Sequence, residues 1–194
     1  MQPVLIARDL VANEGNTPVT LEVYDGLTIV QTKRESGGST LSMALAGRYR
    51  PHSGTVEGPG FKGIALAGVT LIDSLERQVP SREAIREEVV WALPFFSRTP
   101  RRQNILEHKY VQPWLEPLQL TDFDPDRTPG ELGVLERFRL RILLALIARP
   151  NAELLIVDDI DQIKKMPLRS ELLADLENVA KHVPVLVTTV NEEL

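Results

Sequence analysis

Cysteine is absent from the 194-residue chain, and histidine occurs only three times. Without cysteine the chain can form neither a disulfide framework nor a thiolate metal site. The histidines, His52, His108 and His182, lie far apart in the sequence, which is typical of incidental surface or core residues rather than of ligands or bases. Disulfide scaffolds and thiolate metal centres are therefore excluded.

The chain also lacks an excess of basic charge and any long apolar run. It carries 22 Lys and Arg against 27 Asp and Glu, a formal net charge of −5, which gives no support to a nucleic-acid-binding surface. No apolar run approaches the roughly 18 residues that a membrane-spanning helix needs. The first residues, MQPVLIARD, place no basic region before a long apolar run and so indicate no signal peptide. We expect a cytoplasmic protein that reaches the inner face of the cell membrane only through a partner.

The remaining pattern predicts a mixed α/β fold. A length of 194 residues is that of one ordinary domain, or of a core with one inserted subdomain. Hydrophobic residues make up 43% of the chain and charged residues 25%, which is typical of a soluble globular protein. Short apolar runs bounded by turn residues predict strands at 4–12, 19–23, 27–30, 54–57, 64–67, 154–157 and 185–189. Helical periodicity predicts helices at 41–46, 81–92, 104–115, 131–148 and 168–181.

The order of these segments predicts the domain organisation. Strands that are apolar throughout and alternate with helices indicate a mostly parallel sheet buried on both faces. The helical block at 81–130 interrupts this alternation. Residues 1–80 and 131–194 should therefore form an α/β core, with a small N-terminal β part, and 81–130 an inserted helical subdomain.

Three features of the helical block bear on its structure and contacts. Ser81 should cap the first helix. The aromatic residues Trp91, Phe95 and Phe96 are typical of a subdomain core, with a partner-docking surface as the alternative. The basic loop at 97–102 is typical of a solvated turn, with a contact to anionic lipid or to a partner as the alternative.

The stretch 32–40 follows a predicted strand and leads into a predicted helix, which is the layout of a phosphate-binding P-loop. In such a loop, backbone N–H groups and the positive end of the helix dipole hold phosphate. The full pattern is G-x-x-x-x-G-K-[ST], and here it falls on Thr32, Gly37, Gly38 and Ser39. The second glycine and the hydroxyl are present. Threonine replaces the first glycine, and Gly38 replaces the lysine that reaches the terminal phosphates.

Three segments together resemble the nucleotide-binding domain of ABC transporters. They are GGSTL at 37–41, AGRYRPHSGTV at 46–56 and ARPNAELLIVDD at 148–159. The first two are similar to the family's G-K-S-T-L and L-A-G-L-x-x-P-x-S-G-x-V, and the third to the helix end and strand of its Walker B motif. The resemblance covers nearly the whole chain. It implies a P-loop α/β core, ATP and Mg²⁺ as cofactors, and a membrane permease or another ABC-type subunit as partner, in an assembly that can be a dimer.

Several positions that work on ATP in this family carry other residues here. Val134 and Leu135 replace the two glycines of the signature L-S-G-G-Q, whose amides approach the γ-phosphate of the opposite subunit. The Q-loop glutamine falls near Gly68 and the switch histidine on Val190. No aromatic residue occurs near 11–16, where the family has an adenine-stacking ring.

The resemblance assigns site residues one by one. Mg²⁺ would be bound by Ser39 and Asp158, and Asp159 occupies the position of the catalytic glutamate, one methylene shorter. The lost lysine is worth one charge-assisted hydrogen bond of about 1.5–3 kcal/mol, so we expect the affinity for ATP to fall by roughly one to two decades. Nucleotide would be held by Lys33, Ser36, Gly37, Gly38, Ser39 and Thr40.

Two functions are consistent with these residues. In the first, the chain is a degenerate ABC-type subunit, a pseudo-ATPase, which binds nucleotide weakly or not at all and acts by docking to a membrane permease or sister subunit. In the second, it is a functional Mg-dependent ATPase in which Lys33 replaces the Walker lysine and Asp159 is the catalytic carboxylate. The family's docking cleft for the permease should lie around 68–74 and 91–96.

Overall fold

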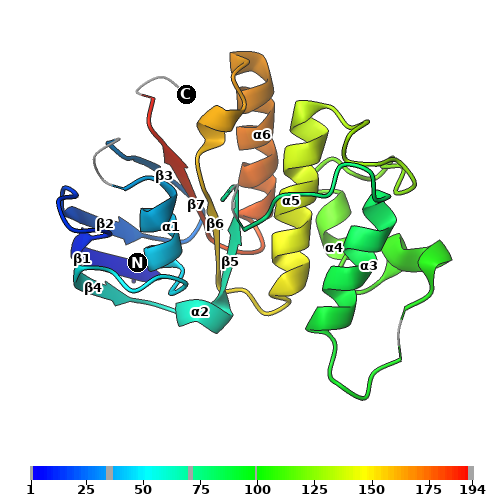
Figure 1. Cartoon of the computed structure of the whole chain (residues 1–194), viewed down its shortest axis with the longest axis horizontal. Helices are drawn as coiled ribbons and strands as arrows, with labels where there is room; N and C mark the ends of the chain where they lie inside the picture. Colours follow the sequence, from blue (N-terminus) through cyan, green and yellow to red (C-terminus); the bar gives the residue numbers. More distant parts are fainter. Residues whose placement is uncertain (1, 34–36, 70–71, 99, 192–194) are drawn as a thin grey trace.

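Two β-sheets organise the fold in the computed structural model, which describes residues 2–33, 37–69, 72–98 and 100–191 (Figure 1). The parallel sheet has the order β3-β7-β6-β5, and the antiparallel sheet the order β2-β1-β4. The parallel strands are β3 (Leu27–Gln31), β5 (Ile64–Ala67), β6 (Leu154–Val157) and β7 (Val185–Thr189). The antiparallel strands are β1 (Leu5–Val11), β2 (Val19–Val23) and β4 (Ser53–Glu57). The expected α/β fold, with its mostly parallel sheet and small N-terminal β part, is confirmed.

Helices cover both sides of the parallel sheet. The α-helices are α1 (Ser39–Leu45), α2 (Gly60–Gly63), α3 (Ser81–Ala92), α4 (Gln112–Leu115), α5 (Val134–Ala148) and α6 (Met166–Val179), and the 3-10 helices are η2 (Arg102–Glu107) and η3 (Ile160–Gln162). Figure 1 shows α1 and the antiparallel sheet on one side of the parallel sheet, and α5 and α6 on the other. Helix α3 lies beyond α5 and packs against it.

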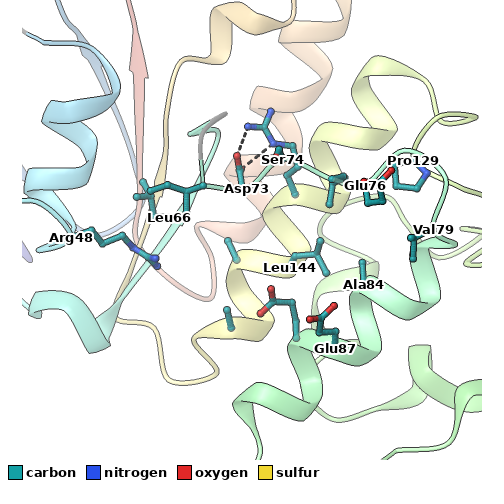
Figure 2. Close-up of a pocket in the computed structure, with 16 residues that line it drawn as sticks. Arg48, Leu66, Asp73, Ser74, Glu76, Val79, Ala84, Glu87, Pro129 and Leu144 are labelled. Carbon is teal, nitrogen blue, oxygen red and sulfur yellow. Dashed lines mark hydrogen bonds and ion pairs between the residues drawn. The ribbon is translucent and has the colours of Figure 1, made fainter.

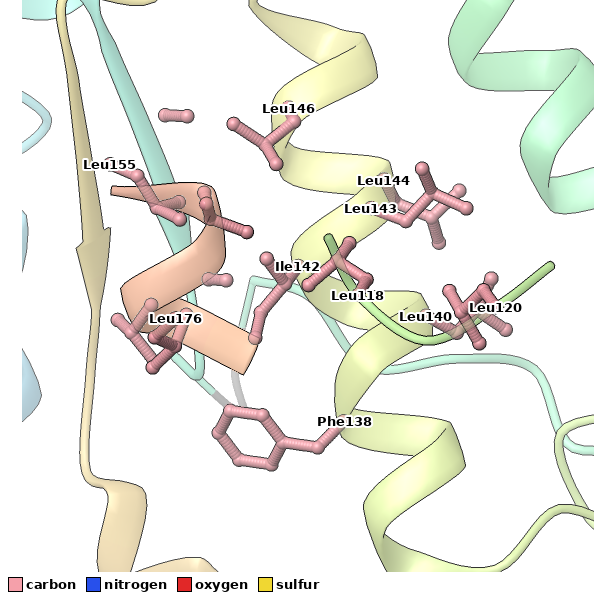
Figure 3. Packing of buried hydrophobic residues seen from close by; sticks show 14 of the residues in the cluster. Leu118, Leu120, Phe138, Leu140, Ile142, Leu143, Leu144, Leu146, Leu155 and Leu176 are labelled. Carbon is pink, nitrogen blue, oxygen red and sulfur yellow. The ribbon is translucent and has the colours of Figure 1, made fainter. Parts of the chain in front are cut away.

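The strands β5, β6 and β7 are apolar throughout because both of their faces are buried. Successive side chains of a strand point to opposite faces of the sheet. Leu154 and Ile156 therefore join the cluster formed with α1 and β1, whereas Leu155 and Val157 join the larger cluster formed with α5 and α6. Figure 3 shows this larger cluster, in which Leu155 lies beside residues of both helices. The two clusters hold the carboxyl ends of the parallel strands in fixed positions.

The predicted helix at 104–115 is wrong, because the structure has two short pieces there, η2 and α4, separated by a turn. The reason is Pro113, which lies in the first turn of α4. Inside a longer helix, proline would remove a hydrogen bond and clash with the preceding turn, at a cost of about 3 kcal/mol. The helix can therefore begin only just before Pro113.

Two predicted helix starts also need correction. Ser81 is the first residue of α3 rather than its cap, and its N–H and hydroxyl both donate to the carbonyl of Arg127, at 3.0 and 2.7 Å. Helix α5 begins at Val134 instead of residue 131. The carboxylate of Glu131 accepts hydrogen bonds from the N–H and hydroxyl of Thr128, which fixes a turn before the helix. The division into a core and an inserted subdomain at 81–130 stays a prediction.

None of the helices in the described part of the chain is both long enough and apolar enough to cross a bilayer.

Candidate functional site

The P-loop connects β3 to α1. Thr32 leaves β3 with its N–H donating to the carbonyl of Thr189 at 2.7 Å, which ties the start of the loop to β7. Gly37 and Gly38 have φ of 98° and 49°, in the region that favours glycine. A Cβ atom on Gly37 would lie 2.7 Å from Oδ1 of Asn16, so a larger residue there would have to displace the Asn16 side chain in addition to straining the backbone. Ser36 lies outside the described residues.

A cavity of about 220 Å³ lies between this loop and the carboxyl ends of the parallel strands. This edge of a parallel α/β sheet is where such folds place their ligands. The cavity includes four of the residues assigned from the sequence, Gly38, Ser39, Asp158 and Asp159. It is completed by Thr32, Thr188, Thr189 and Val190. Among the described residues of its lining, none is a lysine or an arginine.

Asp158, at the end of β6, is buried and accepts three hydroxyl hydrogen bonds. Ser39 donates to its Oδ2 at 2.5 Å, and Ser42 and Thr188 donate to its Oδ1 at 2.5 and 3.1 Å. These bonds tie α1 and β7 to β6 through one carboxylate. Ser42 and Thr188 were not identified from the sequence. The spacing of Ser39 and Ser42, which places both on one face of a helix, is the signal that could have identified Ser42.

Asp159 lies beside Asp158 in a left-handed backbone conformation, with φ of 48°. Its N–H donates to the hydroxyl of Thr188 at 3.0 Å. Burial raises the pKa of the Asp159 carboxyl, and the neighbouring carboxylates Asp158 and Asp161 raise it further. The carboxyl that corresponds to the family's catalytic glutamate is thus held where ionisation is unfavourable.

Asp161 fixes the loop after β7, which contains the switch position Val190. Its carboxylate accepts hydrogen bonds from the N–H of Val190, the hydroxyl of Thr189 and the amide of Asn191, at 2.7, 2.8 and 2.7 Å. Burial alone would raise the pKa of Asp161, but these hydrogen bonds and the guanidinium of Arg169 outweigh it and lower the pKa. Where the family has a histidine, this chain has a backbone turn bonded to an aspartate.

The oxygen donors of the cavity fit Mg²⁺ better than they fit the phosphates of ATP. The Ser39 hydroxyl and the Asp158 carboxylate are hard oxygen ligands of the kind that Mg²⁺ prefers. Bound Mg²⁺ would neutralise phosphate charge there. The cationic side chain that the pattern requires is absent at Gly38, and Lys33 is exposed and does not line the cavity. Thr40 lies in the first turn of α1, also outside the lining.

The positions that the resemblance assigns to the signature and the Q-loop carry residues other than those of the family pattern. Val134 is 52% exposed at the start of α5, whereas Leu135 turns into the core. Only Val134 therefore presents a side chain at the surface in place of a signature glycine. A Cβ atom on Gly68 would lie 2.1 Å from the carbonyl oxygen of Asp158, so no glutamine could replace Gly68 in this backbone.

Gly68 is instead part of a hydrogen-bonded network that joins three segments. Its N–H donates to Asp73 at 2.7 Å, and its carbonyl accepts from the amide of Gln162 at 2.6 Å. Arg141 of α5 binds both oxygens of Asp73, at 2.5 and 3.0 Å, and donates to Gln162 at 2.9 Å. The segment after β5 is thereby joined to α5 and to the residues after β6.

A groove of about 380 Å³ lies beside this network, between α5, α3 and the segment at 72–76 (Figure 2). Figure 2 shows Glu87 and Leu144 facing into it from α3 and α5. Of the expected docking cleft around 68–74, residues 72–74 line this groove and Gly68 does not, while residues 70–71 lie outside the described part of the chain. The aromatic residues at 91–96 do not line it.

The interpretation of these aromatic residues as subdomain core is wrong. Phe95 and Phe96 are 94% and 96% exposed, and Trp91 is 78% exposed. An aromatic residue from another part of the chain approaches the segment at 11–16, which itself has none. The hydroxyl of Tyr49 donates to Oδ1 of Asn13 at 2.7 Å.

Comparison with known proteins identifies relatives by sequence. No family model matches the chain. Two uncharacterised ABC transporter ATP-binding proteins, from two strains of Mycobacterium tuberculosis, are each 32% identical to it over 155 residues. The match covers 78% of this chain and 20% of each relative, so the chain spans about one fifth of the length of these relatives.

Solved structures share the fold at lower sequence identity. CbiO1 from Clostridium perfringens, part of the ABC transporter complex CbiONQ, has a TM-score of 0.74 at 14% identity, covering 99% of this chain and 80% of its own. A metal-chelate type ABC transporter in an inward-facing conformation has a TM-score of 0.72 at 19% identity, covering 97% of this chain and 73% of its own. The sequence relatives and the structural neighbours of this chain are thus ATP-binding cassette proteins of ABC transporters, and its fold is the P-loop NTPase fold of their ATP-binding domains.

Proposed function

We propose that this cassette is a degenerate ABC-type subunit that binds ATP and Mg²⁺ weakly or not at all. The observation that carries the proposal is Gly38, which stands in the lysine position of a cavity whose described lining contains no basic side chain. Phosphate groups there would approach the carboxyls of Asp158 and Asp159, with no cationic side chain among the described residues of the lining. Opposite charges favour phosphate binding and like charges oppose it, so this lining disfavours the nucleotide.

On this proposal the cassette acts by docking to a membrane permease or to a sister subunit. The groove beside the Asp73–Arg141 network supports docking, because it lies between α3, α5 and the segment at 72–76, where the family receives a short helix of its permease. Four acidic residues, Asp73, Glu76, Glu87 and Glu88, line this groove. The subunit would then be cytoplasmic and peripheral at the inner face of the membrane, with no role in nucleic-acid binding.

A second candidate function is that of a working Mg-dependent ATPase. Asp159 favours it, because its carboxyl lines the same cavity as Ser39 and has a raised pKa, as catalytic acids and bases often do. This function also requires Lys33 to move onto the phosphates. Measurable ATP turnover that is lost in both Lys33→Ala and Asp159→Asn would establish it over the first proposal.

The variant Gly38→Lys separates binding from turnover. A lysine there would gain a charge-assisted hydrogen bond of about 1.5–3 kcal/mol, offset by about 1–2 kcal/mol of strain at a positive φ. We expect ATP to bind at most about thirtyfold more tightly. Turnover by the purified variant should stay at background, because the signature and switch positions are unchanged.

The matched control is Gly60→Lys, which adds the same charge at another positive-φ glycine with open space around it, outside the described lining of the cavity. It should leave ATP affinity unchanged. Robust ATP hydrolysis by Gly38→Lys would contradict the proposal, because it would mean that the lysine is the only missing catalytic element.

A further inference from the structure

The two most exposed aromatic side chains of the described residues lie side by side after α3. The rings of Phe95 and Phe96 contact each other edge to face, with centroids 5.2 Å apart, and almost all of their surface is open to solvent. Trp91, on the last turn of α3, is also exposed. Figure 1 shows that the loop carrying the two phenylalanines extends away from the rest of the fold. Exposed apolar groups that gather in this way usually mark a contact surface.

The charge of this segment is opposite to that of the whole chain. Residues 89–106 contain three arginines and no aspartate or glutamate, whereas the chain as a whole has a formal net charge of −5. Arg98 and Arg101 are exposed beside the two phenylalanines in the sequence. The loop is held back to α3 by the side chain of Arg86, whose Nε donates to the carbonyl of Pro100 at 3.2 Å. Exposed aromatic rings and exposed arginines thus occur close together in the sequence, on a loop that is hydrogen-bonded to α3.

We propose that these residues form a patch, made of Trp91, Phe95, Phe96, Arg98 and Arg101, that binds the surface of an anionic lipid bilayer. The phenylalanine rings would enter the boundary between headgroups and acyl chains, and the arginines would meet lipid phosphates. Tryptophan and other aromatic residues are favoured at that interface, and basic residues are attracted to anionic leaflets. Stable binding at a membrane surface needs two such signals, and this patch supplies an apolar and a cationic one.

The shape of the patch favours a lipid surface over a folded protein partner. The two rings project from a loop and do not line the described groove. A fluid bilayer accepts protruding rings without a matching cavity. The inference does not rest on the proposed pseudo-ATPase function, because it uses neither the nucleotide cavity nor the groove.

Co-sedimentation of the purified chain with protein-free vesicles tests whether the patch binds an anionic lipid bilayer. Binding should occur with vesicles of phosphatidylcholine mixed with phosphatidylglycerol, and should be much weaker with phosphatidylcholine alone. Phe95→Ser/Phe96→Ser should weaken binding at least tenfold, since burying one phenylalanine contributes about 1.5–3 kcal/mol. Arg98→Gln/Arg101→Gln should weaken it roughly thirtyfold, at about 1 kcal/mol for each charge near the surface.

The matched controls are Arg50→Gln/Arg77→Gln, which removes the same charge from exposed sites outside the patch, and Phe61→Ala, which removes a half-exposed ring on α2. Both should bind vesicles as the parent does. All patch variants should keep the parent's melting temperature, because the substituted side chains are exposed. No binding to protein-free anionic vesicles, or equal binding to both lipid compositions, would overturn the inference, as would binding only to membranes that contain an integral protein.

Discussion

Replacing Asp158 by alanine should lower the free energy of unfolding by about 3 kcal/mol, measured by urea denaturation. The substitution removes three hydrogen bonds to a buried carboxylate and leaves the hydroxyls of Ser42 and Thr188 without that partner in the protein interior. Hydrogen bonds to charged groups contribute about 1.5–3 kcal/mol each, and a buried donor left unpaired costs about 1–3 kcal/mol. Because all of these hydrogen bonds share the one carboxylate of Asp158, their contributions to the free energy of unfolding do not add fully.

Asp159→Asn is the matched control, since it removes a neighbouring carboxyl of the same cavity. The raised pKa of Asp159 means that the native state loses stability as pH rises from the ordinary carboxyl range through the raised value. Asparagine removes this loss and tolerates the left-handed backbone. We therefore expect Asp159→Asn to be at least as stable as the parent at neutral pH, with the difference vanishing on acidification. Equal stability of Asp158→Ala and the parent would contradict a structural role for Asp158.

Replacing Asp73 by alanine should be similarly destabilising, by about 3 kcal/mol. The change leaves the guanidinium of Arg141 largely buried without its bidentate partner and removes the acceptor of the Gly68 N–H. Removing one member of a buried ion pair typically costs about 3–5 kcal/mol, and this pair retains some exposure, which places the expected value at the low end.

The double variant Asp73→Ala/Arg141→Leu is the control for this prediction. It should recover much of the lost stability, because an apolar residue no longer leaves a charge unpaired. A single variant that unfolds at the same urea concentration as the parent would show that the network does not join the segment after β5 to α5.

The strands could be predicted from the sequence because burial on both faces makes their pattern simple. The runs at 64–67, 154–157 and 185–189 coincide with β5, β6 and β7. The helices at 81–130 were harder to predict than the strands. The break in the predicted helix at 104–115 depends on the single residue Pro113 and on which hydrogen-bond partners the backbone groups have. The bond from Ser81 to Arg127 could not be inferred from the sequence around Ser81.

Several residues of the candidate site could be predicted from the sequence, but the ion pairs and hydrogen bonds that join them to other segments could not. Gly38, Ser39, Asp158 and Asp159 were identified from motif positions, and the structure brings them together in one cavity. The Asp73–Arg141 pair joins residues 68 positions apart, and no local pattern indicates it. The exposure of the two phenylalanines was likewise not predictable, because an apolar run has the same appearance in a core and on a surface.

On the proposed function, the hydrogen bonds of Asp158 explain why an aspartate would be kept at the Walker B position of a cassette with weak nucleotide binding. Its carboxylate joins α1, β6 and β7 through Ser39, Ser42 and Thr188. On the proposed function, selection would keep this residue for the fold even where the lysine has been lost.

A calorimetric titration of the purified chain with ATP and Mg²⁺ tests the central claim most directly. With Gly38 in place of lysine, we expect a dissociation constant near or above the high micromolar range, roughly two decades weaker than a typical micromolar site. A low-micromolar constant for the parent chain, lost on Lys33→Ala, would contradict the proposed weak binding and identify Lys33 as the replacement for the missing lysine.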